Sequence, residues 1–420
     1  MRKTMTTAML GFALMASTAL ADDVRLMWYS DGVEGEVMKD LVARFNAENP
    51  DINLILDEVA YKVVQEQLQI QLEAGEGPDI ARVTNIKALA PHWLDLTPHL
   101  TDADYWRTNF GAHADWMRED GSDAITGFMT QLTLTGGFAN ATLFEQAGVA
   151  MPGAGATWDD WVNAAAEVAA SQGTAAAFAI DRSGHRISGP AVSYGANFIG
   201  ADGKPAPVDA GVKAFAEKLV AWVEEGKMLK DTWVAASGSS YRAAADDFIN
   251  ADIPYYYSGS WQIANLSTKI GDAFDWVATG SPCGSNGCSG LAGGAALVAV
   301  KYTKNPEEVA KVMEFLAREE IVKEFSERTL FLPAHAAVAS KGGLAWVTED
   351  KNVATALDQF IAAAAQIEPA AAALPSWKWA SAYYGALANR ISQVMAGEMT
   401  LDEAYARIDE DITEQVAAAN

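Results

Sequence analysis

The order of strand and helix patterns after residue 21 constrains the fold of this chain more than any other feature. Residues 24–28 and 52–56 alternate as strands do, residues 37–45 and 61–73 carry apolar side chains at helical spacing, and residues 79–83 form a third short strand pattern. This βαβαβ order is typical of a parallel sheet covered by helices. We therefore predict an α/β protein.

A second α/β unit is predicted beyond residues 127–139, an extended Thr-rich segment that we expect to cross between lobes. Thr157, followed three residues later by Asp160, predicts a capped helix start, and Asn305-Pro306 predicts another. Between and around these helices we predict strands at 178–180, 253–257, 274–277 and 295–300 and helices at 212–225 and 239–249. A chain of 420 residues, half of them apolar, has the length of two or three domains.

The N-terminus has the layout of a secretory signal peptide. Arg2 and Lys3 precede an apolar stretch at residues 8–16, and Ala19-Leu20-Ala21 supplies the small residues of a cleavage site. A membrane anchor is the alternative, but the apolar core is shorter than the ~20 residues of a spanning helix. We expect cleavage after Ala21, no lipid-bearing Cys nearby, and export to the periplasm.

The charge balance limits the partners of the chain. Asp and Glu number 55 against 30 Lys and Arg, a formal charge of −25, and no Lys/Arg-rich stripe occurs. Nucleic acid and anionic membranes are therefore poor partners.

The two cysteines, Cys283 and Cys288, flank the turn-rich sequence 284–287. An oxidising compartment would let them pair as a local disulfide. A zinc site is the competing interpretation, but zinc prefers four ligands and no His or Cys cluster lies nearby. We predict the disulfide, no bound metal and no cofactor.

Five segments together resemble the extracellular solute-binding proteins of ATP-driven sugar importers, of the maltose/glycerol-phosphate-binding type. They read "LMWYSDGVEGEVMKDLVARFNAENPDI", "LEAGEGPDIARVTN", "NATLFEQAGV…TWDDWVNAA", "PYYYSGSWQIANL" and "GGAALVAVKYTKNPEEVAKVMEFLAREE". The resemblance implies two α/β lobes joined by two or three crossovers, with a sugar bound in the cleft and a membrane permease as partner. After the signal peptide at 1–21 we expect a first lobe of 22–132 plus 290–335 and a second of 136–289 plus 336–420. We also expect a monomer that closes on its ligand.

Candidate ligand contacts of the first lobe follow its strands, since α/β sheets present ligand contacts outside the carboxyl ends of their strands. They are Ser30, Asp31 and Glu34 after the first strand and Arg82 and Asn85 at the third. Carboxylates accept hydrogen bonds from sugar hydroxyls. Capping of the following helix is the alternative role for Asp31. The resemblance places two further polar contacts on the crossover segment, Gln131 and Thr133.

Candidate contacts of the second lobe centre on the sequence "IDRSGHRISG" and on one tryptophan. Arg182, His185 and Arg186 gather hydrogen-bond donors in an acidic chain, which suits either sugar hydroxyls or an anionic group; ion pairs between the lobes are the alternative. Trp261 follows a turn where the family places an aromatic ring, and a flat apolar ring with polar neighbours suits a sugar.

Three further positions complete the predicted site. Gly293 and Gly294 would let the backbone approach the ligand closely. The resemblance favours Tyr384 as a wall of the cleft.

The sequence carries none of the short catalytic motifs G-x-S-x-G, H-E-x-x-H, G-x-x-x-x-G-K-[ST] or C-x-x-C. We therefore expect a binding protein rather than an enzyme. A secreted glycosidase stays open as an alternative, because paired carboxylates leave no short motif. A neutral sugar is favoured over an anionic derivative such as a glycerol phosphodiester, sulfosugar or uronide.

Overall fold

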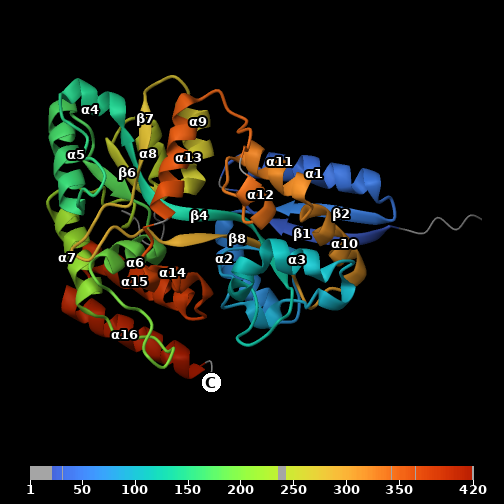
Figure 1. Ribbon diagram of the computed structural model, residues 1–420. Coiled ribbons are helices and arrows are strands. Elements are labelled where there is room, and N and C mark those ends of the chain that lie inside the picture. Colours follow the sequence, from blue (N-terminus) through green and yellow to red (C-terminus); the bar gives the residue numbers. More distant parts are fainter. Residues whose placement is uncertain (1–20, 31, 235–242, 342, 365, 419–420) are drawn as a thin grey trace, which may run out of the picture.

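The computed structural model describes residues 21–30, 32–234, 243–341, 343–364 and 366–418, arranged as two lobes (Figure 1). The predicted signal sequence up to Leu20 and the candidate ligand residue Asp31 lie outside the described residues. Among the described helices, none combines the length and the hydropathy needed to cross a lipid bilayer.

The first lobe is built on the predicted βαβαβ unit. Its elements are β1 (Asp22–Trp28), α1 (Glu34–Glu48), β2 (Ile52–Glu58), α2 (Tyr61–Glu73), β3 (Ile80–Val83), α3 (Ala103–Phe110), β8 (Ala292–Ala299), α10 (Pro306–Leu316), α11 (Glu319–Thr329), α12 (Ala336–Lys341) and the short 3₁₀ helices η1 (Ala90–His92), η2 (Thr97–His99) and η3 (Gly111–Trp116). Alternate side chains of a strand point to opposite faces of its sheet. Leu26 and Trp28 accordingly pack with α1, α10 and α11, whereas Met27 and Tyr29 pack with α2.

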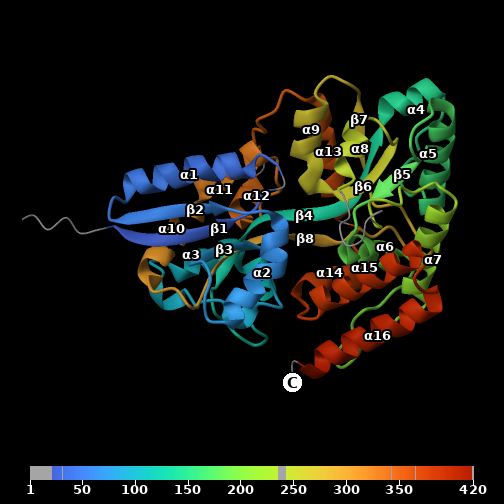
Figure 2. The same ribbon diagram turned by 180° about the vertical axis from the view of Figure 1, so that it is seen from behind.

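The second lobe shares strand β4 (Gly127–Asn140) with the first. Its other elements are α4 (Ala141–Ala147), α5 (Trp158–Gln172), β5 (Phe178–Ile180), α6 (Gly184–Ser193), α7 (Ala210–Glu224), α8 (Ala245–Ile249), β6 (Tyr255–Gly259), η4 (Ser260–Gln262), α9 (Ile263–Ile270), β7 (Trp276–Gly280), α13 (Lys351–Ala364), α14 (Pro369–Ala372), η5 (Leu374–Ser376), α15 (Ala380–Ala396) and α16 (Leu401–Ala418). Helices α5, α6, α7, α15 and α16 contribute to one core, and α8, α9 and α13 contribute to another. In both views α16 lies along α15 at the lower edge of this lobe (Figures 1 and 2).

One continuous sheet links the two lobes in the order β2-β1-β3-β8-β4-β6-β5, with β7 paired to β4. Strands β2, β1 and β3 are parallel, whereas β8 runs antiparallel to both β3 and β4. The beginning of β8 and the middle of β4 therefore cross together between the lobes. The segment that follows α11 is also bonded to this crossing, because the backbone N–H of Leu132 donates to the carbonyl of Leu332, 2.9 Å away.

The predicted lobe boundaries stay a prediction. The packing of helix α12 favours a later position for the last boundary, which the sequence analysis places after residue 335. Helix α12, which the sequence division assigns to the second lobe, contacts α3 and α11 of the first. Its Val338 lies in the first-lobe core, while Val353 of α13 lies in a second-lobe core. These contacts favour a boundary between Lys341 and Lys351 rather than at residue 335.

Several local predictions are confirmed and others need correction. Helix α2 has the predicted bounds, and Thr157 and Asp160 form a reciprocal capping box at the start of α5. Asn305 stands at the N-cap of α10, but its side chain makes no capping hydrogen bond there, and its Nδ2 donates to the carbonyl of Asp23.

Several element boundaries also differ from the sequence prediction, and strand β8 begins three residues earlier than predicted, at Ala292. The helix predicted from residue 239 begins only at Ala245 among the described residues. Strands β6 and β7 each begin two residues later than predicted, at Tyr255 and Trp276.

The predicted disulfide between Cys283 and Cys288 is present. Its loop is bonded to the start of α5, because the backbone N–H of Cys283 donates to Ala156 and the N–H of Trp158 donates to Cys283. The disulfide thus fixes a loop that holds a helix terminus.

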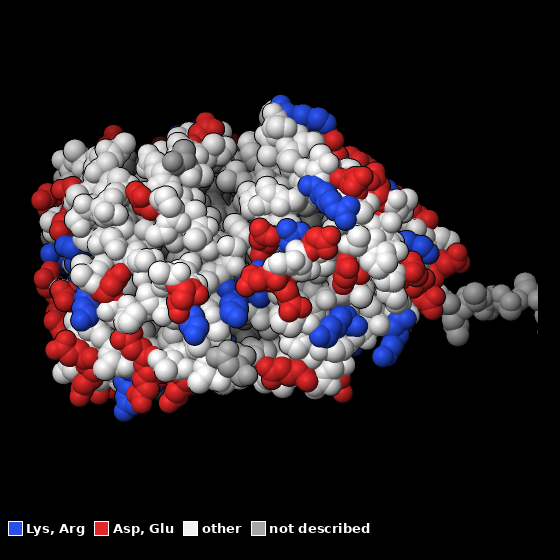
Figure 3. All heavy atoms as spheres, turned by 60° about the horizontal axis from the view of Figure 1, so that its bottom comes forward, with Lys and Arg blue, Asp and Glu red and all other residues white. Residues whose placement is uncertain are grey.

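Charged side chains are spread over the surface. On the face shown in Figure 3, Asp and Glu occur over both halves of the molecule, with Lys and Arg between them singly or in small groups.

Candidate ligand-binding site

The second-lobe part of the site is organised by the first turn of α6. Ser183 is the N-cap, and its side chain accepts a hydrogen bond from the backbone N–H of His185. This start places His185 and Arg186 directly after strand β5, at the carboxyl end of the sheet. The sequence analysis does not predict this helix.

Arg186 lies over the ring of Trp261, with 4.2 Å between its guanidinium carbon and the ring centroid. Its Nη2 is 4.0 Å from Oδ2 of Asp181, too far for a hydrogen bond. Asp181 instead accepts hydrogen bonds from the hydroxyls of Tyr256 and Ser258, the latter at 2.6 Å. A carboxylate anchored to β6 therefore holds the guanidinium electrostatically over the tryptophan.

Trp261 lies in η4, directly after β6, and is 9% exposed. Any side chain at Gly259 would overlap the ring, so glycine is needed there. The ring also packs at the edge of the first-lobe core. Trp261 thus belongs to the second lobe by sequence and contacts the first.

His185 lies between two aromatic rings. Its ring centroid is 5.5 Å from that of Tyr384 and 6.5 Å from that of Trp261. Burial, followed by the positive charge of Arg186, lowers the pKa of His185 to about 3, although a hydrogen bond with the backbone of Ala292 opposes the change. The imidazole is therefore neutral at physiological pH.

Two polar atoms of this cluster lack partners among the described residues, Nδ1 of His185 and Nε of Arg186. A buried polar atom without a hydrogen bond is costly. These atoms could bind polar groups of a ligand.

The crossover strands supply the floor beside His185. Thr133 on β4 pairs with Gly293 on β8, and a Cβ at Gly293 would lie 3.1 Å from Nε2 of His185. Gly294 is explained by the strand pairing itself, because its φ of +152° and the nearby carbonyl of Gln131 leave no room for a side chain. Gln131 is buried and accepts a hydrogen bond from the hydroxyl of Thr130.

In the first lobe, Arg82 and Glu34 form a fully buried pair. Their side chains are 0% and 1% exposed, and Nη1 of Arg82 lies 3.1 Å from Oε1 of Glu34. The same nitrogen donates to the carbonyl of Tyr29, and the guanidinium lies over the rings of Trp28 and Tyr29. This arrangement supports the fold around the end of β1, and ligand contact by either residue stays a prediction.

The remaining candidates have well-defined partners. Ser30 donates to Glu58, and this bond, together with Lys39, lowers the pKa of Glu58. Asn85 accepts a hydrogen bond of 2.5 Å from Ser381 of α15 and so joins the two lobes. Arg182 donates to Ser392 and Asn389 of α15, which directs its guanidinium along the second lobe's own helix.

The structure therefore brings together Thr133, His185, Arg186, Trp261, Gly293 and Tyr384 at the crossover. Sequence reasoning missed Asp181 and Ser381. Asp181 could have been found, because it directly follows a predicted strand, the rule applied to other candidates. Nothing in the sequence singles out Ser381.

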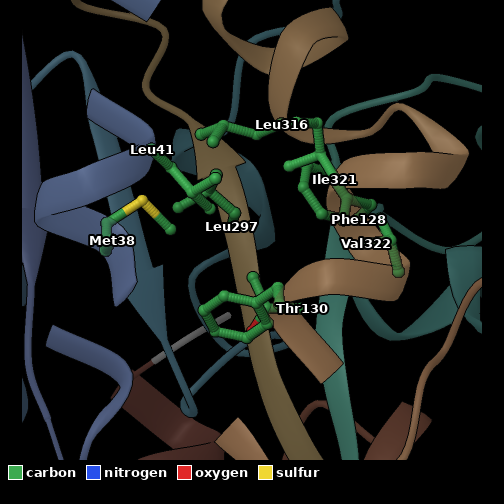
Figure 4. A pocket seen from close by; sticks show the side chains of 9 residues that line it. Met38, Leu41, Phe128, Thr130, Leu297, Leu316, Ile321 and Val322 are labelled. Atoms are coloured by element: carbon green, nitrogen blue, oxygen red, sulfur yellow. The ribbon is translucent and has the colours of Figure 1, made fainter. Parts of the chain in front are cut away.

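A separate apolar cavity of about 20 Å³ lies in the first-lobe core (Figure 4). Met38, Leu41, Phe128 and Leu297 are among the residues that line it. Ligand pockets usually measure roughly 300–1,000 Å³. This cavity is too small for a sugar and is a packing defect.

The chain matches the family of bacterial extracellular solute-binding proteins over residues 40–355, and it belongs to this family. That family consists of binding proteins rather than enzymes. Comparison with curated protein sequences finds no significant match.

Solved structures resemble the fold over nearly the whole chain. The GacH receptor of Streptomyces glaucescens, determined unliganded and with acarbose, is 18% identical with a TM-score of 0.77 and covers 93% of this chain and 97% of its own. Lmo0181 from Listeria monocytogenes, in complex with cycloalternan, is 17% identical with a TM-score of 0.79, covering 94% and 99%. The MalE domain of Bdellovibrio bacteriovorus, bound to maltotriose, is 15% identical with a TM-score of 0.77, covering 94% and 100%. The chain therefore has the two-lobed periplasmic binding protein fold that the sequence predicts.

Proposed function

We propose that this protein is the substrate-binding component of an ATP-driven importer and that it carries a sugar between its lobes. The observation that carries the proposal is the cluster at the crossover, where His185 and Arg186 present unpartnered polar atoms beside Trp261. Sugars combine apolar C–H faces with polar edges, and this cluster offers both kinds of surface. The sugars bound by GacH, Lmo0181 and the Bdellovibrio protein support the same ligand class.

Each residue of the cluster has a role in this proposal. Trp261 packs against a ligand ring, and Tyr384 forms a wall. Neutral His185 accepts a hydroxyl at Nδ1, and Arg186 donates through Nε. Thr133 and Gly293 form the floor.

The first-lobe contacts are proposed as Ser30, Asp31, Glu34, Arg82, Asn85 and Gln131. Arg182 and Gly294 complete the proposed set.

The biological setting follows from the same proposal. The chain is exported to the periplasm, is cleaved after Ala21, acts as a monomer without a cofactor and delivers its ligand to a membrane permease. It performs no catalysis, which incubation of the purified protein with glycosides and product analysis would test.

A thermal-shift screen tests the ligand class. The panel contains neutral oligosaccharides, polyols, glycerol phosphodiesters and acidic sugars. A ligand that binds only the folded protein stabilises it by RT ln(1 + [L]/Kd), about 2.7 kcal/mol at a hundredfold excess over Kd. A clear rise with a sugar supports the proposal, and the absence of any rise across the sugars contradicts it.

Small-angle scattering tests closure of the lobes. Two lobes joined by crossovers form a hinge arrangement, so the radius of gyration of the monomer should fall when the best ligand is added. An unchanged radius at saturation would contradict closure.

An anionic sugar derivative is the second candidate. Its supporting observation is that, among the described residues, the carboxylate paired with Arg186 is that of Asp181, at 4.0 Å, which is too long for a hydrogen bond. A phosphate, sulfonate or uronate would form stronger, charge-assisted bonds there. The glycerol phosphodiesters and acidic sugars of the same screen decide between a neutral sugar and an anionic derivative.

A further inference from the structure

Asp181 is fixed in position by the neighbouring strand β6. Its backbone N–H donates to the carbonyl of Tyr257, 3.4 Å away, and its carboxylate accepts hydrogen bonds from the hydroxyls of Tyr256 and Ser258. Tyr256 and Ser258 are both fully buried. Burial raises the pKa of Tyr256 well above its ordinary value, so this phenol keeps its proton and stays a donor. The carboxylate of Asp181 is therefore held at the carboxyl end of β5.

This carboxylate is the acidic partner of Arg186 in the binding cluster. Oδ2 of Asp181 lies 4.0 Å from Nη2 of Arg186, and the two side chains are 18% and 19% exposed. His185 beside them is neutral at physiological pH, because burial lowers its pKa. Asp181 and Arg186 together carry no net charge, although the arginine on its own would attract an anion.

An anion that binds Arg186 also meets the charge of Asp181. A hydrogen-bond acceptor lies about 2.9 Å from its donor nitrogen, so an acceptor at Nη2 of Arg186 is at most roughly 7 Å from Oδ2 of Asp181. The Debye length at physiological ionic strength is ~8 Å, and partly buried charges are screened less than exposed ones. Repulsion from Asp181 therefore offsets much of the attraction that an anionic ligand gains from Arg186. An uncharged hydroxyl meets no such repulsion and still accepts a hydrogen bond from the guanidinium.

We propose that Asp181 determines the charge specificity of the site: it offsets the charge of Arg186 and so selects uncharged sugars over sugars that carry a carboxylate, sulfonate or phosphate. This inference rests on the proposed function and chooses between its two ligand candidates. Asp181 exerts the effect through its charge, while its oxygens stay bonded to Tyr256 and Ser258.

Charge selection is measured with pairs of neutral and acidic sugars. Glucose and glucuronate, galactose and galacturonate, and maltose and maltobionate are titrated calorimetrically into the wild type and Asp181→Asn. Asn keeps the shape of Asp and one oxygen that accepts hydrogen bonds. Asp159→Asn is the matched control, because it removes the same charge from an exposed carboxylate of the second lobe that lies 2.7 Å from Nζ of Lys218.

We expect the wild type to bind each neutral sugar that it accepts at least about tenfold more tightly than the acidic counterpart. Asp181→Asn should narrow this ratio about tenfold, chiefly by tightening the acidic sugars, and should leave the neutral sugars within about threefold of the wild type. Asp159→Asn should leave the ratio unchanged. A purely structural role of Asp181 would weaken both members of a pair alike.

The outcomes separate the role of Asp181 from the proposed function. A wild type that binds none of these sugars removes the proposed function and the charge selection with it. A wild type that prefers the acidic sugars overturns the selection and leaves sugar binding standing. The same holds for a ratio that Asp181→Asn does not narrow, or that Asp159→Asn narrows as much. A melt of each variant checks folding. If Asp181→Asn is destabilised, Asp181→Ser, which removes the charge and keeps a hydroxyl, must show the same narrowing.

Discussion

Each lobe places an arginine over an aromatic ring beside a carboxylate, but only the ion pair of the first lobe is completely buried. Arg82 lies over Trp28 and Tyr29 with Glu34 at 3.1 Å, and both members of the ion pair are buried. Arg186 lies over Trp261 with Asp181 at 4.0 Å, and its side chain is 19% exposed. The same residue types therefore form a close, buried ion pair in one lobe and a longer, partly exposed one in the other.

Burial and hydrogen bonding account for the difference. Taking a charge out of water is costly unless a partner and hydrogen bonds compensate it. Arg82 has Glu34 and the Tyr29 carbonyl as such compensation. Asp181 is instead bonded to Tyr256 and Ser258, which leaves Arg186 held near the ring by charge rather than by a direct bond. A ligand can therefore contact Arg186 without breaking a direct ion-pair hydrogen bond, which would cost more free energy at Arg82.

Substitution of Arg82 should have the largest effect. Arg82→Met leaves the Glu34 carboxylate buried without its cation, and loss of one member of a buried pair costs about 3–5 kcal/mol. Denaturant unfolding measures this loss. Adding Glu34→Met should recover part of it, since apolar replacements of buried pairs are often tolerated.

The control for this substitution is an exposed ion pair. Arg44 lies 2.8 Å from Glu324 with both side chains substantially exposed, and Arg44→Met should cost about 0–1 kcal/mol. Equal costs for Arg82→Met and Arg44→Met would contradict the view that the first cluster is a structural element.

Trp261→Ala should come next in size and should affect binding. Removing a ring that packs a ligand face costs on the order of 2–3 kcal/mol, or roughly 30- to 150-fold in Kd. Because the ring is 9% exposed and also contacts the first-lobe core, we expect some loss of stability as well. Calorimetric titration beside a thermal melt separates the two effects.

Trp379→Ala is the matched control, since Trp379 packs against the second-lobe core. It should lower stability without a specific loss of affinity. If Trp261→Ala behaves in the same way, the ring of Trp261 serves packing alone.

The sequence predicts the fold well because local patterns and fold agree in most elements. Alternation marks β1 and β2, helical spacing marks α1 and α2, and the Thr157–Asp160 box marks the start of α5. Helix α6 was missed because its sequence includes Gly184, Gly189 and Pro190, which are poor helix formers. Every residue of α6 from Ile187 to Ser193 is buried, so tertiary packing rather than propensity stabilises this helix.

The candidate site is less predictable because its contacts are long-range. Asp181 meets Tyr256 and Ser258 only because β5 pairs with β6, which brings Ile180 opposite Tyr257. The sequence also treats Arg82, Arg182 and Arg186 alike. Their different surroundings, a buried pair, the α15 helix and a tryptophan ring, follow from packing between segments far apart in the chain.

Substitution of the two second-lobe arginines should give smaller and unequal effects. Arg186→Gln removes the group over Trp261 and should weaken binding of the best ligand about tenfold, equivalent to about 1.4 kcal/mol. Arg182→Gln should weaken binding less, by about threefold, because Ser392 and Asn389 of α15 already accept hydrogen bonds from Arg182 and leave it a smaller share of the proposed ligand contacts. Titrations at low and high salt also show whether the ligand is charged, since salt weakens binding of an anion more than binding of a neutral sugar. Equal losses of affinity from Arg186→Gln and Arg182→Gln would contradict this difference between the two arginines.

The pH dependence of stability should give the smallest effect near neutrality, and it isolates His185. Its folded-state pKa of about 3 lies below the ordinary value of 6.5, because burial and then Arg186 disfavour the protonated ring. The unfolded chain therefore binds more protons between these values, so the His185 contribution is complete above about pH 6.5 and is lost as the pH falls towards 3. Burial also lowers the pKa values of His113 and His335, but these contributions cancel between the wild type and His185→Gln. Denaturant unfolding from pH 7 to pH 4 should show the wild type losing stability more steeply than His185→Gln, and parallel curves would mean that the His185 ring is protonated as readily in the folded protein as in the unfolded chain.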